Sequence, residues 1–329
     1  NGRMKQMKKA DDNRKPLIQT VNLKKYFNTP FGLLHAVDDI NLSIDKGKTL
    51  GVVGESGCGK STLGRTILRL LPLTDGQVLF DGENILGYDK EKMRLMRQKM
   101  QMIFQDPYAS LNPRKTVFQI IAEPLIVNRI YGSRNEINDR VLFLMETVGL
   151  AERFINSYPH ELDGGRRQRI GIARALSMSP QFIVCDEPVS ALDVSIQAQI
   201  LNLLMDLQER LGLTYMFITH DLAVVKHISD EIAVLYVGQC VEKAPSKELF
   251  RNPIHPYTKI LLSSIPVPSL KSRISEREII RGEVTDPINP KPGCRFAPRC
   301  KFFKPECLSE DLSLNEVKPG HYVMCKLFG

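Results

Sequence analysis

Short apolar runs, separated by polar and glycine-containing turns, recur through the chain. Runs such as 49–53 and 181–186 are rich in valine, isoleucine and leucine and do not alternate with polar residues. Continuous apolar runs of this kind are typical of strands buried on both faces, as in a parallel sheet covered by helices. The pattern predicts strands near 17–22, 37–44, 49–53, 77–81, 100–104, 181–186, 213–219 and 230–237.

A different periodicity appears between about residue 106 and residue 178. Val141, Leu142, Met145 and Val148 recur at intervals of one, three and three. This spacing places the four side chains on one face of a helix. We therefore expect a mainly helical insert, with this stripe in its core rather than on a partner-binding face.

Length and composition restrict the class of protein. The chain has 329 residues, of which 43% are apolar and 25% charged. This is enough for a hydrophobic core and for more than one domain. No stretch approaches 18 consecutive apolar residues, so we expect no membrane-spanning helix. Residues 1–15 contain no apolar run, so we expect no secretory signal.

The net charge of +8 is concentrated in two segments. Residues 1–15 and residues 281–304 each contain six basic and two acidic side chains, so the rest of the chain is neutral overall. A neutral body lacks the basic face that binding to a phosphate backbone requires. We expect no nucleic-acid partner, and we interpret residues 1–15 as a disordered, solvated tail.

A phosphate-binding loop follows the apolar run at 49–53. The sequence there is Gly-Glu-Ser-Gly-Cys-Gly-Lys-Ser-Thr, followed by a helical stretch to about Leu71. Glycines let successive N–H groups turn toward phosphate oxygens, and the start of a helix favours an anion. Lys60 is suited to the β- and γ-phosphates and Ser61 to Mg²⁺. We expect ATP to contact Gly54, Glu55, Ser56, Gly57, Cys58, Gly59, Lys60, Ser61 and Thr62.

Polar residues follow three other expected strands. In a parallel sheet they would lie at the same edge as the phosphate loop. Asp186 is suited to bind Mg²⁺, and Glu187 to act as general base toward the attacking water. His220 could orient that water, and Gln105 could contact the water or Mg²⁺.

One further motif distinguishes this chain from other phosphate-loop enzymes. Leu162-Asp163-Gly164-Gly165-Arg166 precedes a helical run and resembles the signature motif of ABC ATPases. The resemblance covers about residues 16–245 and implies a RecA-like α/β core with an antiparallel β edge and a helical signature subdomain. It makes Gln105 the Q-loop glutamine, Asp193 part of the D-loop and His220 the switch histidine. It also implies that Phe27, or its neighbour Tyr26, stacks on adenine, and that Gly164, Gly165 and Asp193 contact nucleotide.

A narrower resemblance concerns the transported cargo. The phosphate loop, the run Phe-Gln-Asp-Pro-Tyr-Ala-Ser-Leu-Asn-Pro at 104–113 and Asn-Pro-Ile-His-Pro-Tyr-Thr at 252–258 are similar to oligopeptide and dipeptide importer ATPases. The F-type of their two ATPase subunits is most similar. The resemblance implies a bacterial subunit at the cytoplasmic face of the membrane. It further implies a heterodimer with a second ATPase, two permease subunits and, indirectly, an extracytoplasmic binding protein, with residues 246–329 as a C-terminal extension.

Several alternatives stay open on sequence alone. Nickel importers share much of the pattern, export is not excluded by the motor residues, and a non-transport ABC ATPase remains a further reading. A silent regulatory subunit is disfavoured by the intact Lys60, Asp186, Glu187 and His220. The signature itself departs from the usual Leu-Ser-Gly-Gly-Gln, and the charge of Asp163 would repel a phosphate. We hypothesise that the ATP site closed by Asp163 is slow or structural.

Four cysteines lie near the C-terminus in the spacing C-x5-C-x6-C-x17-C. Zinc sites usually have closer ligand pairs, whereas iron–sulfur clusters accept varied loops. The related importer extensions resemble this region and are thought to hold a four-iron four-sulfur cluster. We therefore expect such a cluster to stabilise the extension through Cys294, Cys300, Cys307 and Cys325, with zinc, or four unbridged buried thiols, as the alternatives.

Overall fold

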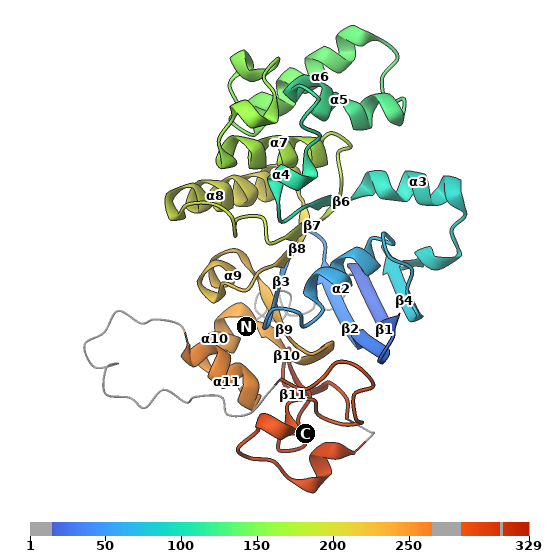
Figure 1. Ribbon diagram of the computed structural model, residues 1–329, viewed down its shortest axis with the longest axis vertical. Coiled ribbons are helices and arrows are strands. Elements are labelled where there is room, and N and C mark those ends of the chain that lie inside the picture. Colours follow the sequence, from blue (N-terminus) through green and yellow to red (C-terminus); the bar gives the residue numbers. More distant parts are fainter. Residues whose placement is uncertain (1–14, 265–283, 310–311, 329) are drawn as a thin grey trace, which may run out of the picture.

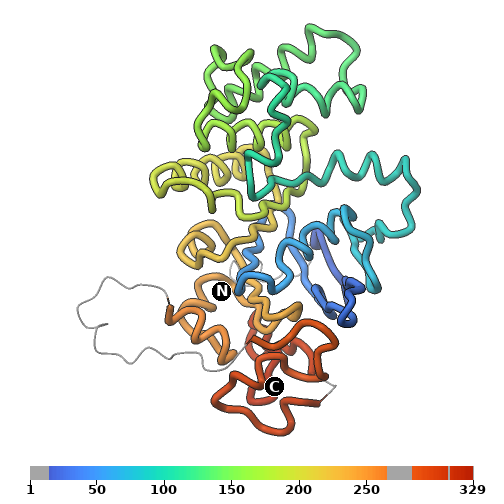
Figure 2. Tube along the Cα trace, viewed as in Figure 1, coloured from blue at the N-terminus to red at the C-terminus, as the bar shows by residue number. Residues whose placement is uncertain are grey.

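The computed structural model describes residues 15–264, 284–309 and 312–328. Its elements form three tiers along the long axis (Figures 1 and 2). Helices α5 to α8 lie at one end, two β-sheets lie in the middle, and the C-terminal region lies at the other end. The basic stretch 1–15 falls almost entirely outside the described residues.

The larger sheet has eight strands in the order β11-β12-β10-β9-β3-β8-β7-β6. Its five strands from β9 to β6 run parallel. Every residue of β3, β7 and β8 is buried, which explains the continuous apolar runs in the sequence. The bounds of these strands are β3 Thr49–Val53, β6 Met100–Ile103, β7 Phe182–Asp186, β8 Thr214–Ile218 and β9 Glu231–Tyr236.

The C-terminal region extends this sheet rather than folding apart from it. Strand β10 (Gln239–Pro245) runs antiparallel to β9, and β12 (His321–Val323) then pairs with β10. Strand β11 (Asn315–Lys318) forms the outer edge. Strand β12, near the C-terminus, thus hydrogen-bonds to the same sheet that contains β3 of the phosphate-loop region.

The second sheet is antiparallel, in agreement with the expected antiparallel edge. Its order is β2-β1-β4-β5, and β1 and β2 are longer than the sequence pattern predicted. The two strands form a hairpin that continues through polar positions because backbone pairing does not require apolar side chains. Their bounds are β1 Pro16–Thr29, β2 Gly32–Asp45, β4 Asp75–Phe80 and β5 Glu83–Asn84.

Helices cover both faces of the parallel strands. The alternation along β8 shows this directly: Tyr215 and Phe217 join a core with α5 to α8, whereas Met216 and Ile218 join a core with α2 and the antiparallel sheet. The α-helices are α2 Lys60–Ile67, α3 Lys90–Lys99, α4 Pro107–Ser110, α5 Val117–Val127, α6 Arg134–Thr147, α7 Gly164–Leu176, α8 Val194–Leu211, α9 Leu222–Ile228, α10 Ser246–Arg251 and α11 Pro256–Ser263. The short 3₁₀ turns are η1 Ile85–Gly87, η2 Glu152–Phe154, η3 Pro159–Glu161, η5 Ala297–Arg299 and η6 Pro305–Leu308.

The insert between β6 and β7 is helical, as its periodicity predicted. Val141, Met145 and Val148 are buried in the core of that tier, while Leu142 is half-buried. Helices α5 and α6 both begin with a capping box, formed around Thr116 and Ser133. These side chains satisfy N–H groups that a helix start otherwise leaves without partners.

Candidate active site

The loop Gly54–Gly59 connects β3 to α2 and requires glycine at two places. Gly59 has φ of 101°, and a Cβ added there would lie 2.0 Å from the backbone oxygen of Ala36. At Gly54 a Cβ would lie 2.1 Å from the backbone oxygen of Leu235. Neighbouring backbone therefore confines the loop, and only glycine fits its two ends. Helix α2 begins after Gly59 without a side-chain cap, so its first N–H groups point toward the loop.

The side chain of Lys60 is buried beneath this loop. Its Nζ donates to the backbone oxygens of Gly54 at 2.8 Å and Glu55 at 2.9 Å. Only 6% of the residue is exposed. The ammonium group thus lies inside the loop, where it supplies positive charge to any anion that the loop binds.

Ser61 and Asp186 meet directly beside the loop. The Ser61 hydroxyl donates to Oδ1 of Asp186 at 2.6 Å, and Asp186 is completely buried at the end of β7. Its Oδ2 accepts no hydrogen bond, although Nη2 of Arg65 lies 3.5 Å away. Burial raises the pKa of Asp186, and the Ser61 hydroxyl and Arg65 partly offset that rise. A buried carboxylate oxygen without a hydrogen bond, next to a serine hydroxyl, is a donor set that suits Mg²⁺.

Glu187 lies next to this pair and has a backbone conformation that is rare outside glycine, with φ of 46°. Its Oε2 accepts from Nε2 of Gln105 at 2.8 Å, and its Oε1 lies 3.2 Å from Nδ1 of His220. The three residues follow β6, β7 and β8, which are neighbours in the sheet. Parallel strands end at one edge, so the structure brings together three residues that the sequence placed there.

The signature residues lie elsewhere. Asp163 caps α7 by accepting from the backbone N–H of Arg166 at 2.8 Å, and Nη1 of Arg166 pairs with its other oxygen at 2.5 Å. Gly165 packs closely on α8, because a Cβ there would lie 2.8 Å from Ile196. Figure 1 shows helix α7 apart from α2, the helix that follows the phosphate loop.

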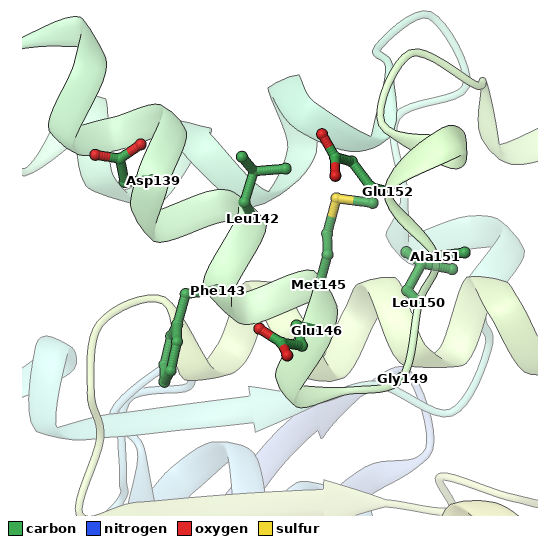
Figure 3. A pocket seen from close by; sticks show the side chains of 9 residues that line it. All are labelled: Asp139, Leu142, Phe143, Met145, Glu146, Gly149, Leu150, Ala151 and Glu152. Carbon is green, nitrogen blue, oxygen red and sulfur yellow. The ribbon is translucent and has the colours of Figure 1, made fainter.

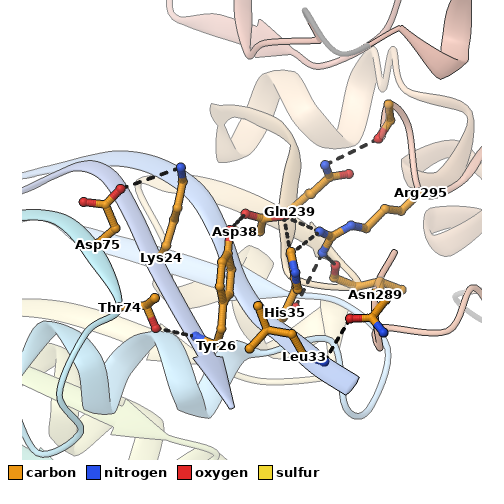
Figure 4. A network of polar contacts seen from close by, with 12 residues as sticks. Lys24, Tyr26, Leu33, His35, Asp38, Thr74, Asp75, Gln239, Asn289 and Arg295 are labelled. Atoms are coloured by element: carbon orange, nitrogen blue, oxygen red, sulfur yellow. Dashed lines mark hydrogen bonds and ion pairs between the residues drawn. The ribbon is translucent and has the colours of Figure 1, made fainter. Parts of the chain in front are cut away.

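Two aromatic side chains on β1 are already engaged. Lys25 Nζ lies 4.6 Å from the centroid of the Phe27 ring. Tyr26 stacks on His35 with ring centroids 3.9 Å apart, and its hydroxyl donates to Asp38 (Figure 4). Burial and the hydrogen bond to Asp38 raise the pKa of Tyr26. Tyr26 is thereby fixed in place.

The structure contradicts the prediction of an iron–sulfur cluster. Throughout the described residues, no group of three or more histidine, cysteine, aspartate or glutamate side chains is arranged to hold a metal ion. Burial raises the pKa of Cys294 to about 12, and the pKa of Cys300 and Cys325 is raised for the same reason. The prediction that an iron–sulfur cluster or zinc staples this extension was wrong.

Protein contacts hold the region instead. Phe296 is completely buried, and its ring meets that of Tyr236 edge-on with centroids 5.3 Å apart. The backbone N–H of Cys294 donates to the carbonyl of Cys307 at 2.8 Å. The residues that pack together are widely separated along the chain, so the sequence did not reveal these contacts.

A pocket of about 680 Å³ lies in the helical tier (Figure 3). Phe143 and Met145 of α6 contribute apolar surface to it, and Glu146 and Glu152 contribute carboxylates. None of the residues lining it belongs to the phosphate loop or to the strand ends. It is therefore separate from the candidate nucleotide site.

Three contacts at the site were not anticipated from the sequence. Arg299 reaches Glu55 of the phosphate loop, Arg295 reaches Asp38, and the hydroxyl of Tyr257 accepts the backbone N–H of Glu55 at 3.0 Å. The three residues come from the C-terminal region. The run at 252–258, which resembles importer ATPases, contains Tyr257, and the run at 293–300, typical of the same group, contains both arginines.

Comparison with known proteins agrees with this geometry. Residues 37–190 match the family described as ABC transporter, and residues 241–307 match the oligopeptide/dipeptide transporter C-terminal region. The ATP-binding cassette MJ0796, solved as a dimer bound to ADP and Pi, has a TM-score of 0.64 and 32% identity over 70% of this chain and 98% of its own. CbiO1 from Clostridium perfringens, part of an ABC transporter complex, also has a TM-score of 0.64, with 29% identity over 72% of this chain and 91% of its own. The chain belongs to the ABC transporter family, as an ATP-binding subunit with ATPase activity.

Curated relatives narrow the branch of the family. The chain is 53% identical to the oligopeptide transport ATP-binding protein OppF of Bacillus subtilis, over 94% of this chain and 96% of the relative. It is 49% identical to AppF of the same organism, also named an oligopeptide transport ATP-binding protein, over 96% and 98%. The dipeptide transport ATP-binding protein DppF of Haemophilus influenzae is 48% identical over 94% and 96%.

These findings bear on two expectations, one about membrane-spanning helices and one about the partner ATPase. No helix in the part of the chain that the structure describes is both long and apolar enough to cross a membrane. The expected pairing with a different ATPase chain, as a heterodimer, has no support in the comparisons.

Proposed function

We propose that this chain hydrolyses ATP to power the uptake of dipeptides or oligopeptides through an ABC importer. The observation that carries the proposal is the meeting of Gln105, Glu187 and His220 at the sheet edge that also holds the phosphate loop. The cargo rests on near full-length similarity to OppF, AppF and DppF, and on the match of residues 241–307 to the C-terminal region of peptide transporters.

In this proposal the loop Gly54–Gly59 and the start of α2 bind the phosphates of ATP through backbone N–H groups. Lys60 exchanges its contacts with Gly54 and Glu55 for the β- and γ-phosphates. The aromatic ring of Phe27, or that of Tyr26, stacks on the adenine. Cys58 contributes its backbone only, because its buried thiol, whose pKa burial raises, stays uncharged.

The residues beside the loop fit a Mg²⁺ ion. Asp186 offers an oxygen without a hydrogen bond, Ser61 offers a hydroxyl, and the Gln105 side chain is close by on Glu187. Mg²⁺ bound there would neutralise phosphate charge during transfer. The Ser61 hydroxyl donates to Asp186 and so shields part of that carboxylate's charge.

Glu187 is the proposed general base. Its carboxylate accepts a proton from a water molecule as the water oxygen attacks the γ-phosphorus. The bond from that phosphorus to the bridging oxygen of ADP breaks, so the products are ADP and inorganic phosphate. Gln105 and His220 hold the two carboxylate oxygens from opposite sides and so position the base.

The signature residues require a second cassette in this scheme. Helix α7, which begins at Gly164, lies apart from α2 in Figure 1, so Gly164 and Gly165, together with Asp193, would act on ATP bound by a partner cassette. The start of α7 supplies N–H groups and the positive end of its dipole toward that ATP. The Asp163 charge is offset by Arg166. No observation tests whether Asp163 slows ATP hydrolysis at this site, so that hypothesis stays a prediction.

We assign residues 16–245 to the ATPase domain and 246–329 to an extension that also joins its sheet. The subunit would act at the cytoplasmic face of a bacterial membrane, bound to two permease subunits and supplied by a peptide-binding protein. The helical tier of this subunit, α5 to α8, would contact the permease subunits.

The test is transport by the complete assembly in sealed vesicles. The chain is co-expressed with the permease and cassette genes beside it, and uptake of radiolabelled tripeptides is measured with ATP inside the vesicles. We expect ATP-dependent uptake that competing peptides suppress and that Glu187→Gln abolishes. ATP-dependent uptake of nickel, or of another solute, without peptide competition would overturn the cargo assignment.

A further inference from the structure

The side chain of Arg299, in the C-terminal region, contacts the phosphate loop. Arg299 lies in the turn η5, 244 residues after Glu55. Its Nη1 lies 3.3 Å and 3.2 Å from the two carboxylate oxygens of Glu55, and 3.2 Å from the hydroxyl oxygen of Tyr236. The Arg299 side chain is only 8% exposed. The ion pair is thus largely shielded from solvent on the arginine side.

The backbone of Glu55 is held as well. Its N–H donates to the hydroxyl of Tyr257 at 3.0 Å, and its carbonyl accepts from Lys60 at 2.9 Å. Every polar group of Glu55, the second residue of the phosphate loop, therefore has a partner. Tyr257 and Arg299 provide two of these contacts, and both lie outside the expected ATPase domain.

The groups that contact Glu55 are themselves packed rigidly. Tyr257 is completely buried, and its ring centroid lies 4.7 Å from that of Tyr236 and 5.5 Å from that of Phe296. Phe296 belongs to the same turn as Arg299. Such aromatic clusters leave little freedom to the groups attached to them.

Arg295, two residues before η5, makes a second contact near the proposed nucleotide site (Figure 4). Arg295 is 4% exposed, and its Nη2 forms an ion pair with Asp38 on β2. Asp38 also accepts from the Tyr26 hydroxyl and faces Nδ1 of His35 at 3.1 Å. Burial alone would raise the pKa of Asp38, but Tyr26, His35 and Arg295 outweigh burial and lower it. The turn is thereby anchored to the β1–β2 hairpin.

Glu55 needs such a partner for an electrostatic reason. It places a carboxylate in a loop whose proposed ligand carries several negative charges, and like charges at this range repel. An arginine that binds both carboxylate oxygens cancels the charge and fixes the direction of the side chain. Without Arg299, the carboxylate would be free to turn toward the phosphates.

We propose that the C-terminal region positions the phosphate loop for ATP, with Arg299 as the positioning residue that neutralises and restrains Glu55. This proposal rests on the proposed ATPase function. It assigns to the C-terminal region a direct effect on nucleotide affinity, carried by the Arg299–Glu55 pair and supported by Tyr257.

Binding of MgATP to the purified full-length chain, measured by calorimetry, tests this role. We expect Arg299→Gln to weaken affinity about three- to tenfold, because an unpaired carboxylate then faces the phosphates. Glu55→Gln should bind at least as tightly as the wild type, since it removes the charge that needs neutralising. The double variant should regain the affinity of Glu55→Gln. Arg299→Lys keeps a cation and should lose less than Arg299→Gln.

Lys291→Gln is the matched control, since it removes an exposed cation from the same region. Melting curves of each variant separate weakened binding from loss of the fold. Equal affinity in Arg299→Gln and wild type, or a double variant as weak as Arg299→Gln, would overturn the proposal. Lys60→Ala tests the proposed ATPase function itself. That function fails if the wild type binds no MgATP and Lys60→Ala gives the same result.

Discussion

Gln105 and Glu187 are 82 residues apart in the chain, yet the side-chain Nε2 of Gln105 donates to Oε2 of Glu187 at 2.8 Å. His220 approaches the other carboxylate oxygen at 3.2 Å. A carboxylate held on both sides cannot rotate freely, so its orientation toward the phosphate loop is set before ATP binds. The first prediction concerns this carboxylate.

Replacing Glu187 with Gln should lower ATP turnover by about 10²–10⁴, the usual effect of removing a positioned general base. The amide keeps the shape and can still accept from Gln105, but it cannot take a proton at neutral pH. Affinity for MgATP should therefore be retained. Phosphate release by the reconstituted transporter measures the effect, and Glu209→Gln, an exposed glutamate on α8, is the control. Unchanged turnover in Glu187→Gln would remove Glu187 from the mechanism.

Gly59→Ala should abolish MgATP binding and destabilise the fold. The added Cβ would lie 2.0 Å from the backbone oxygen of Ala36, and φ of 101° is unfavourable for alanine. Gly82→Ala is a matched control, because Gly82 has φ of 82° but nothing within 4 Å of the added Cβ. It should cost about 1–2 kcal/mol of stability through backbone strain alone and leave binding intact. Nucleotide binding by Gly59→Ala at wild-type affinity would contradict this account.

Asp163→Ala should reduce the free energy of unfolding by about 1 kcal/mol, because Asp163 caps α7. Its ion pair with Arg166 contributes less, since both side chains are about half exposed. Asp163→Asn keeps a capping oxygen and should lose much less. Urea denaturation of the three proteins measures the difference. Equal losses in the alanine and asparagine variants would show that the cap is not what stabilises α7.

Acid should destabilise the protein partly through His255. Burial, with a smaller effect of Lys259, lowers the pKa of His255 to about 3 from its usual 6.5. Between these two values the unfolded chain binds a proton that the folded chain does not. This histidine's contribution is therefore present above pH 6.5 and is lost as the pH falls. From pH 7.5 to pH 5, it should cost about 2 kcal/mol.

His255→Asn tests this contribution, because asparagine does not titrate and can still cap α11 by accepting from Tyr257 N–H. Its loss of stability between pH 7.5 and pH 5, measured with urea, should be smaller than that of the wild type by about 2 kcal/mol. His227→Asn, at an exposed position, should behave like the wild type. The same pH dependence in His255→Asn and wild type would show that His255 is not the group responsible.

The sequence by itself was sufficient to predict which residues lie at the sheet edge that holds the phosphate loop. The strand–loop–helix order around Lys60 and the polar residues after three apolar runs are local patterns, and parallel strands necessarily bring their ends together. The sequence therefore predicted that Gln105, Glu187 and His220 lie at one sheet edge, and the structure brings them together there. The helical insert followed for a similar reason, because its periodicity is written in neighbouring residues.

Only the tertiary structure decided how the C-terminal region is used. The pairing of Arg299 with Glu55 and of β12 with β10 joins segments far apart in the chain, and no local pattern encodes which distant partner a charge or a strand will meet. The cysteines show the converse. Their spacing suggested a metal, but among the described residues no group of three or more potential ligands is arranged to hold one, and aromatic packing around Phe296 holds this region. The arrangement of side chains is a property of the folded chain, so residue spacing alone could not reveal it.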